Sequence, residues 1–173
     1  LTPTQGTVGS IVMVRGNGFG ANEGIRISFG TTLTITQIST YACGSWTTYF
    51  TINTQPYGIT TIAAIGLNSN DRVCATFVVM PKVIMLSPCA GTVGTMVTIM
   101  GNGFGASEAI RLSFGTTPTI QITSTSAYGS FATTFIVNTQ SYGTKTISAL
   151  GLNSGGADYN IFRVCPNIIL VMP

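Results

Sequence analysis

Few side chains of this chain are suited to acid, base or metal chemistry. The sequence contains no histidine, which excludes histidine general bases, His-ligated metals and Ser/His/Asp triads. The four carboxylates, Glu23, Asp71, Glu108 and Asp158, are too few to favour an acid/base pair or an oxygen-ligated cation site. We therefore predict no catalytic residue, no metal site and no cofactor, and we expect that the protein is not an enzyme.

Two glutamate–arginine pairs occur with the same spacing along the chain. Glu23 and Arg26 are separated as Glu108 and Arg111 are. A recognition pair is one interpretation, but a surface ion pair that orders a loop is favoured because such pairs are common and weak.

Two further motifs could be interpreted as ligand-binding sites, but each has a simpler structural interpretation. Gly-Asn-Gly-Phe-Gly at Gly16–Gly20 resembles a phosphate loop, but the next segment is a predicted strand rather than a helix, so a structural turn is favoured. Trp46 falls on the same predicted strand face as Phe50 and is assigned to the core. Tyr41 and Tyr49 are expected to face outward, and a carbohydrate-binding surface formed by them is an alternative.

Composition describes a folded, charge-poor protein. Of 173 residues, 6% are charged, against about 25% in ordinary soluble domains. The 28 threonines, 21 glycines and 45% hydrophobic residues do not describe disorder. The seven basic residues are scattered singly, so no nucleic-acid surface is expected. No apolar run reaches the roughly 18 residues of a membrane span. No signal peptide is recognised, as expected of a mature secreted chain or of a segment of a longer one.

An internal repeat fixes the domain organisation. Residues 1–69 align without a gap with residues 86–154, and 42 of these positions are identical. Beyond residue 69 the second copy is expected to gain residues, since Val73-Cys74 matches Val164-Cys165 and Met80-Pro81 matches Met172-Pro173. We predict two tandem domains of one kind, 1–81 and 82–173.

Each copy consists of short alternating segments between turn residues. Ile25, Ile27 and Phe29 alternate with polar residues, and the second copy repeats this pattern. Such period-two segments, with turn signals every eight to twelve residues and no helical window, predict an all-β sandwich.

The opening of each copy resembles a known family. Thr7-Val8-Gly9-Ser10, then Val12 and Val14, then Gly16–Gly20, are similar to the start of an IPT/TIG-type immunoglobulin-like domain. Gly91-Thr92-Val93-Gly94-Thr95 through Gly101–Gly105 repeats this opening. The resemblance covers nearly the whole chain and implies two tandem immunoglobulin-like β-sandwich domains, as in secreted and surface-exposed microbial repeat proteins. Members of the family serve as stalks, adhesin modules, accessory domains beside enzymes and DNA-binding scaffolds, but the basic loops of the last are absent here.

Several apolar side chains are expected to face outward. Ile11 and Met13 lie opposite the inward valines of their strand, as do Met96 and Met100 in the second copy. A contiguous exposed apolar patch marks an interface. A shifted strand register is the alternative explanation.

The first domain is predicted to lack its first strand. Lys82, Val83, Ile84 and Met85 form a first strand before Leu86-Ser87-Pro88, whereas domain 1 begins at the matching Leu1-Thr2-Pro3. An unpaired sheet edge exposes backbone N–H and C=O groups that tend to pair with a strand of another chain. Either preceding residues outside this sequence or another subunit would supply the strand.

The cysteines are Cys43, Cys74, Cys89 and Cys165, and they have no zinc-ligand spacing. Disulfides are favoured and buried free thiols are the alternative. Alternating strand directions place Cys43 and Cys74 at one end of domain 1 and Cys165 at the corresponding end of domain 2. Cys89 is expected at the far end of domain 2, facing a neighbouring subunit.

These observations predict a non-enzymatic extracellular or cell-surface structural protein. It would assemble through head-to-tail contacts as a homo-oligomer or polymer, into a filament, sheath or surface layer. The predicted contact surface comprises Ile11, Met13, Met96, Met100, Lys82, Val83, Ile84 and Met85. The alternative is an immunoglobulin-like spacer or carbohydrate-binding module of an adhesin or larger secreted enzyme.

Overall fold

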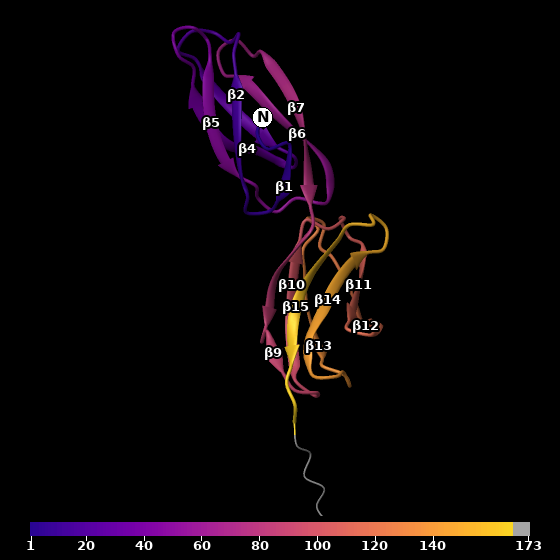
Figure 1. The fold of residues 1–173 in the computed structure, drawn as a ribbon. Coiled ribbons are helices and arrows are strands. Elements are labelled where there is room, and N and C mark those ends of the chain that lie inside the picture. The colour runs from indigo at the N-terminus through magenta and orange to yellow at the C-terminus, as the bar shows by residue number, and fades with distance from the viewer. Residues whose placement is uncertain (168–173) are drawn as a thin grey trace, which may run out of the picture. The chain divides into compact units, whose positions relative to one another are not determined.

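The computed structural model describes residues 1–167 and divides the chain into two compact units, Leu1–Met80 (unit 1) and Pro81–Pro173 (unit 2). All regular secondary structure of the described residues is β-strand (Figure 1). The predicted fold class, all-β with immunoglobulin-like sandwiches, is confirmed. No helix of the described residues has the length and apolar character that a membrane span requires.

Unit 1 is built from two sheets. One has the strand order β1-β7-β6-β3-β4, with β1 parallel to β7, and the other is the antiparallel pair β2-β5. The strands are β1 (Gln5–Thr7), β2 (Ile11–Gly16), β3 (Gly24–Phe29), β4 (Thr32–Ser39), β5 (Trp46–Thr51), β6 (Gly58–Gly66) and β7 (Arg72–Met80).

Unit 2 repeats both sheets and adds one strand. Its sheets have the orders β12-β11-β14-β15-β9 and β13-β10-β8, and β8 is the addition. The strands are β8 (Lys82–Ser87), β9 (Ala90–Gly91), β10 (Met96–Asn102), β11 (Ala109–Phe114), β12 (Thr117–Ser124), β13 (Phe131–Ile136), β14 (Gly143–Gly151) and β15 (Ala157–Val164).

The core of each unit follows from the period of two. In β3, Ile25, Ile27 and Phe29 are fully buried, and their neighbours in sequence are half-buried. The ring centroid of Phe29 lies 5.2 Å from that of Phe50 and 5.7 Å from that of Phe77. Strand faces that alternate in this way fix the register, because a slip of one residue would turn the apolar face to water.

The Gly-Asn-Gly-Phe-Gly segments are turns, as predicted. Phe19 and Phe104 are buried at the ends of the two sandwiches. Gly18 and Gly103 have φ angles of 82° and 70°, in the left-handed region that favours glycine. The motif is therefore structural.

One part of the predicted alignment is wrong. The copies keep a constant offset of 85 to the end of the last strand, because Gln5 pairs with Val78 as Ala90 pairs with Arg163. Cys74 consequently matches Tyr159, and Cys165 matches Met80. The shared Val-Cys dipeptide suggested a different match, but the buried positions decide the register. The Met172-Pro173 part of that match lies outside the described residues.

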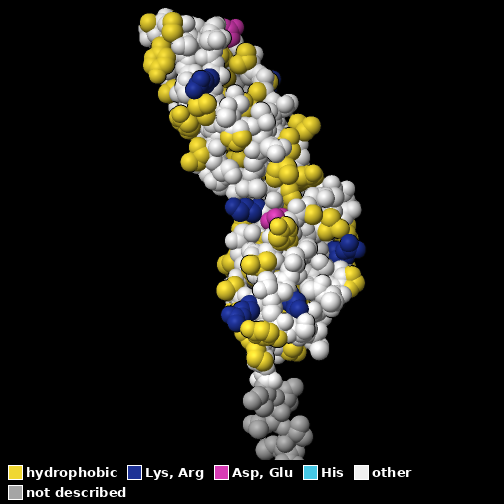
Figure 2. Space-filling model, in the orientation of Figure 1, with side chains coloured by type: hydrophobic (Ala, Val, Ile, Leu, Met, Phe, Trp, Pro, Cys, Tyr) yellow, Lys and Arg dark blue, Asp and Glu magenta, His cyan; other side chains and the backbone are white. Residues whose placement is uncertain are grey.

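The surface carries few charges. Figure 2 shows Lys, Arg, Asp and Glu side chains scattered singly among polar and apolar ones. This agrees with the low charged fraction of the sequence.

Candidate functional site

The carboxylate of Glu23 is buried in a structural role. Its Oε1 accepts hydrogen bonds from Gly20 N (2.7 Å) and Ser69 Oγ (3.1 Å), and its Oε2 accepts from Asn68 N and Ser69 N. The predicted surface ion pair with Arg26 is wrong, because every hydrogen-bond donor to this carboxylate among the described residues belongs to the two turns. Glu23 does order a loop, as expected, but through backbone N–H groups.

Glu108 repeats this arrangement in unit 2. It accepts hydrogen bonds from Gly105 N, Asn153 N, Ser154 N and Ser154 Oγ. Burial raises the pKa of Glu108, but these hydrogen bonds, led by that of the Ser154 backbone, outweigh burial and lower the pKa below its usual value. The pKa of Glu23 is also lowered, chiefly by the Ser69 backbone N–H.

These carboxylates are therefore committed to the fold. A third, Asp158, accepts a hydrogen bond from Val83 N at 2.7 Å. Across residues 1–167, no group of three or more His, Cys, Asp or Glu side chains is arranged to hold a metal ion.

The outer edge of β2 is the place where the two units differ. Thr2 forms an isolated bridge there, in which Thr2 N donates to Met13 O at 2.9 Å and Met13 N donates to Thr2 O at 2.8 Å. Backbone groups of alternate residues point to the same side of an antiparallel strand, so those of Arg15 face the same edge. Within the described part of the chain, no strand pairs with β2 on this side.

In unit 2 the corresponding edge is covered by β8. Met100 pairs with Met85, Gly101 with Val83, and Asn102 with Lys82. The Val83 side chain is only 5% exposed and belongs to the hydrophobic core of unit 2. The sandwich of unit 2 is therefore closed by a residue that has no counterpart in unit 1 among the described residues.

A groove lies beside the open edge of unit 1. It has a volume of about 160 Å³ and runs between β2 and the sheet of β6 and β7. Its walls are mostly apolar, and they are formed by Val14, Arg15, Trp46, Ile62, Ala64, Val73, Cys74 and Ala75.

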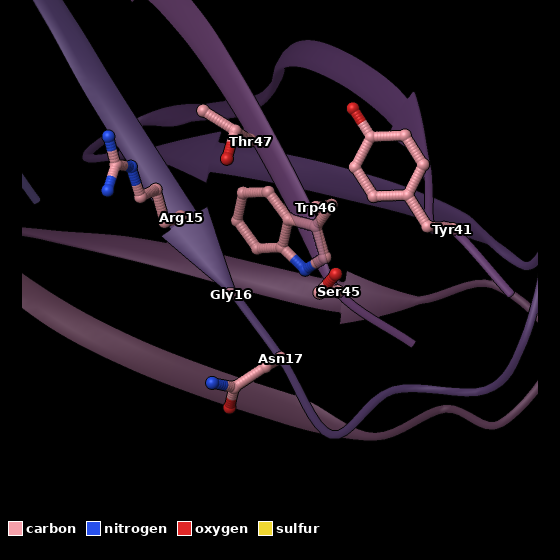
Figure 3. A pocket seen from close by; sticks show the side chains of 7 residues that line it. All are labelled: Arg15, Gly16, Asn17, Tyr41, Ser45, Trp46 and Thr47. Carbon is pink, nitrogen blue, oxygen red and sulfur yellow. The ribbon is translucent and has the colours of Figure 1, made fainter. Parts of the chain in front are cut away.

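A second hollow of about 310 Å³ lies at the end of β2 (Figure 3). Trp46 lines both hollows and is 2% exposed, yet its Nε1 has no hydrogen-bond partner among the described residues. Figure 3 shows this nitrogen on the side of the ring that faces Gly16 and Ser45. A side chain at Gly16 would collide with the indole ring, so glycine is needed for this close approach. The edge therefore combines free backbone groups, an apolar groove and an unpartnered buried N–H donor.

The predicted contact residues fall into two groups. Ile11 and Met96 are 65% and 67% exposed, while Val12 and Val97 are fully buried, which confirms the predicted register and excludes a slip. Met13 and Met100 are half-buried, and Lys82, Ile84 and Met85 are exposed. Val83 is buried in the core of its own unit and is not part of an exposed surface.

The four cysteines, all within the described residues, are free thiols in the structure. Cys43 and Cys74, which the sequence places at one end of domain 1, form no disulfide, and Cys43 Sγ lies 2.9 Å from Ser45 Oγ. Cys89 and Cys165 do not lie at opposite ends of unit 2 as predicted, since both flank the β9–β15 pair. The error follows from the misplaced match of Cys165 with Cys74. Disulfides between subunits remain a prediction.

Sequence reasoning missed the groove and the role of Trp46. Trp46 was correctly assigned to the core, but its counterpart Phe131 carries no N–H, and this difference was the available signal. The distant partners of the buried glutamates, Asn68 and Ser69 for Glu23, could not be read from the sequence, because they lie 45 and 46 residues away along the chain.

Fold and site define a class of protein with tandem immunoglobulin-like β-sandwiches. The family model of the IPT/TIG domain matches residues 81–156, so this part of unit 2 is similar to an IPT/TIG domain, as the sequence resemblance implied. Unit 1 has the same strand order apart from β8. No curated protein sequence matches the chain.

The solved structures that match the chain include an adhesin and a domain of a biofilm associated protein. The adhesin InvE of Yersinia pseudotuberculosis shares 11% identity, with a TM-score of 0.41 over 94% of this chain and 57% of that one. The BSP domain of a biofilm associated protein shares 14% identity, with a TM-score of 0.31 over 93% of this chain and 28% of that one. Murine CEACAM1b shares 15% identity, with a TM-score of 0.30 over 94% and 96% of the two chains. The chain thus spans little more than half of the first protein and about a quarter of the second.

Proposed function

We propose that this chain is a non-enzymatic structural protein of the cell exterior that assembles into a filament, sheath or surface layer through the open β2 edge of unit 1. The open edge beside an apolar groove is the observation that carries the proposal. An unpaired strand edge presents backbone donors and acceptors that another strand satisfies by β-augmentation.

The β2 edge differs between the two units, unlike the other sheet edges of the same sheets. The outer edges of β5 and β13 are unpaired in both units within the described residues, so they belong to the common domain design. Among the described residues no strand pairs with the outer edge of β2, whereas β10 carries β8 at the corresponding edge. Unit 2 therefore supplies a template for what should cover unit 1.

A structural role also agrees with the use of the charged groups. Three of the four carboxylates accept hydrogen bonds from backbone N–H groups and hold turns or strands in place. A charge-poor surface rich in Thr is suited to close, salt-insensitive contacts between subunits.

Assembly through this edge is tested by blocking it. The Arg15→Pro variant removes an N–H that faces the open edge and leaves the β2–β5 ladder its own bonds. Val73→Lys places a charge in the groove wall, and its matched control is Cys74→Lys at the next position of β7, where the side chain is exposed on the opposite face of the strand.

We expect the unmodified chain and Cys74→Lys to form polymers in negative-stain electron microscopy and light scattering. Arg15→Pro and Val73→Lys should remain small, with circular dichroism showing that they are folded. Polymers formed equally well by both edge variants would contradict assembly through this edge.

The second candidate function is a spacer or carbohydrate-binding module of an adhesin or larger secreted enzyme. The observation in its favour is the hollow lined by Trp46, Arg15 and Tyr41, of which Tyr41 is 65% exposed. Glycan-array binding by a monomeric chain, lost in Tyr41→Ala, would favour this function over assembly.

A further inference from the structure

The outer face of β15 differs from that of its counterpart β7, although the inner face is the same. The buried inward side chains Phe162 and Val164 are identical to the buried residues of β7 at the offset of 85. The outward side chains all differ, since unit 1 has Cys74, Thr76 and Val78 where unit 2 has Tyr159, Ile161 and Arg163. The core of the repeat is therefore kept, and the outward surface of β15 is particular to unit 2.

These outward side chains form a row along the sheet. Tyr159 and Ile161 are 66% and 57% exposed, and Arg163 is also exposed. Alternate residues of a strand lie about 7 Å apart, so the three side chains follow one another on one face. A row of hydroxyl groups on β14 lies beside them, because Ser148, Thr146 and Thr144 pair with Tyr159, Ile161 and Arg163.

Arg163 is held at the end of the row by an exposed tyrosine. Its Nη2 donates a hydrogen bond to Tyr142 Oη at 3.0 Å, and its Cζ lies 5.9 Å from the centre of the Tyr142 ring. These contacts orient the guanidinium. Its other N–H donors are left to bind a carboxylate in the two-pronged geometry that arginine favours.

Arg111 is a second exposed cation on the same face. It pairs with Leu150 of β14, and Thr144, the partner of Arg163, lies six residues earlier on that strand. The two cations are therefore about 20 Å apart along the sheet. This spacing exceeds the Debye length of about 8 Å at physiological ionic strength, so each cation acts on its own anion. Double-stranded DNA carries a charge about every 1.7 Å and does not match so sparse a pattern.

The carboxylates of this chain do not complement the face. Both carboxylates of unit 2, Glu108 and Asp158, accept hydrogen bonds from backbone N–H groups. In unit 1, Glu23 is buried in the same way, which leaves Asp71 as the exposed one of the four. A second copy of the chain therefore offers too few free carboxylates, and the face fits a different, anionic molecule.

From these observations we propose that the outer face of β14 and β15 binds a carboxylated polysaccharide. Tyr159 and Ile161 offer apolar surface to the faces of sugar rings. The hydroxyl groups of β14 exchange hydrogen bonds with those of the sugar, and Arg163 and Arg111 each bind a carboxylate. The site lies on unit 2 and does not involve the β2 edge, so it is independent of the proposed assembly. It would attach the protein to an acidic glycan.

Binding of the full chain to polygalacturonate coupled to agarose beads tests the site, since depletion from solution can be followed whether or not the chain is assembled. We expect Arg163→Gln to weaken binding at least about tenfold and Tyr159→Ala at least about fivefold. The matched controls in β7, Arg72→Gln and Cys74→Ala, change exposed positions of unit 1 and should bind within about twofold of the unmodified chain. Circular dichroism verifies that all four variants are folded.

Salt distinguishes this binding from the assembly contacts. Raising sodium chloride to about 0.5 M should release the protein from the beads, because it screens the exposed ion pairs. Beads that carry dextran, a neutral polysaccharide, should retain little protein at any salt concentration.

Several outcomes would overturn the inference and leave the proposed assembly untouched. An equal loss of binding in Arg163→Gln and Arg72→Gln would mean attraction by net charge rather than a site. Equally tight binding to beads carrying poly-glutamate or DNA would replace the polysaccharide by an acidic protein or a nucleic acid. Absence of binding to polygalacturonate by the unmodified chain would refute the site itself.

Discussion

The buried carboxylate of Glu108 gives the sharpest stability prediction. Each carboxylate oxygen accepts two hydrogen bonds, Oε1 from Gly105 N and Ser154 Oγ and Oε2 from Asn153 N and Ser154 N. In the Glu108→Gln variant one oxygen becomes an NH₂ group, which cannot accept. Whichever way the amide points, two donors lose their acceptor.

The expected loss follows from these two bonds. A hydrogen bond to a charged group contributes about 1.5 kcal/mol or more, so we expect the free energy of unfolding to fall by about 3 kcal/mol. For a domain of this size, each kcal/mol lowers Tm by about 4 to 8 °C, which gives a decrease of about 12 to 24 °C for unit 2.

Differential scanning calorimetry at neutral pH measures this change. The matched control is Asp71→Asn, which removes the same charge from an exposed side chain and should change stability by less than about 0.5 kcal/mol. If Glu108→Gln lowered the free energy of unfolding by less than about 1 kcal/mol, the carboxylate would not be what holds the two turns together.

The other predictions concern pH, the core and salt. Because the folded pKa values of Glu23 and Glu108 lie below the usual pKa of a glutamate, the stabilisation by these groups is complete above about pH 5 and is lost as the pH falls through the folded pKa. Acid unfolding followed by circular dichroism should show this loss, and a double Gln variant that kept the same acid slope would contradict it. Trp46→Phe should cost about 1 to 2 kcal/mol, because Phe131 fills the same position in unit 2, whereas Trp46→Ala should cost about 3 to 5 kcal/mol in urea unfolding. Raising the ionic strength from about 0.01 to 1 M shortens the Debye length from about 30 to 3 Å and should leave the assembly intact by light scattering; dissolution by salt alone would show that ion pairs hold it.

The fold was predictable because its determinants are local. A strand face shows in the sequence as every second residue, and Ile25, Ile27 and Phe29 lie in the core as that period indicates. Because of the repeat at an offset of 85, the pattern of each strand and turn occurs twice in the sequence. Trp46 in the core and Phe19 at the end of the sandwich were likewise predictable, since both are large apolar side chains in a clear pattern.

The candidate site was predictable only in part. The sequence indicated that Lys82–Met85 form a strand ahead of the second copy, because Leu86 aligns with Leu1. It did not reveal the groove, since the groove is lined by residues of β2, β5, β6 and β7, which lie far apart along the chain. It also misplaced Cys165, because a short identity was weighed above the burial pattern.

The sequence by itself determined the class of structure, namely two charge-poor β-sandwiches that repeat one domain. It could do so because the alternation of buried and exposed side chains along each strand appears directly as alternating apolar and polar residues. The tertiary structure alone decided which groups meet. Glu23 accepts hydrogen bonds from a turn 45 and 46 residues away, and no strand of the described residues covers the edge of β2 that corresponds to the β8-covered edge of β10. Contacts of this kind depend on how sheets fold over one another, and a polar side chain or a free backbone edge leaves no periodic trace in the sequence.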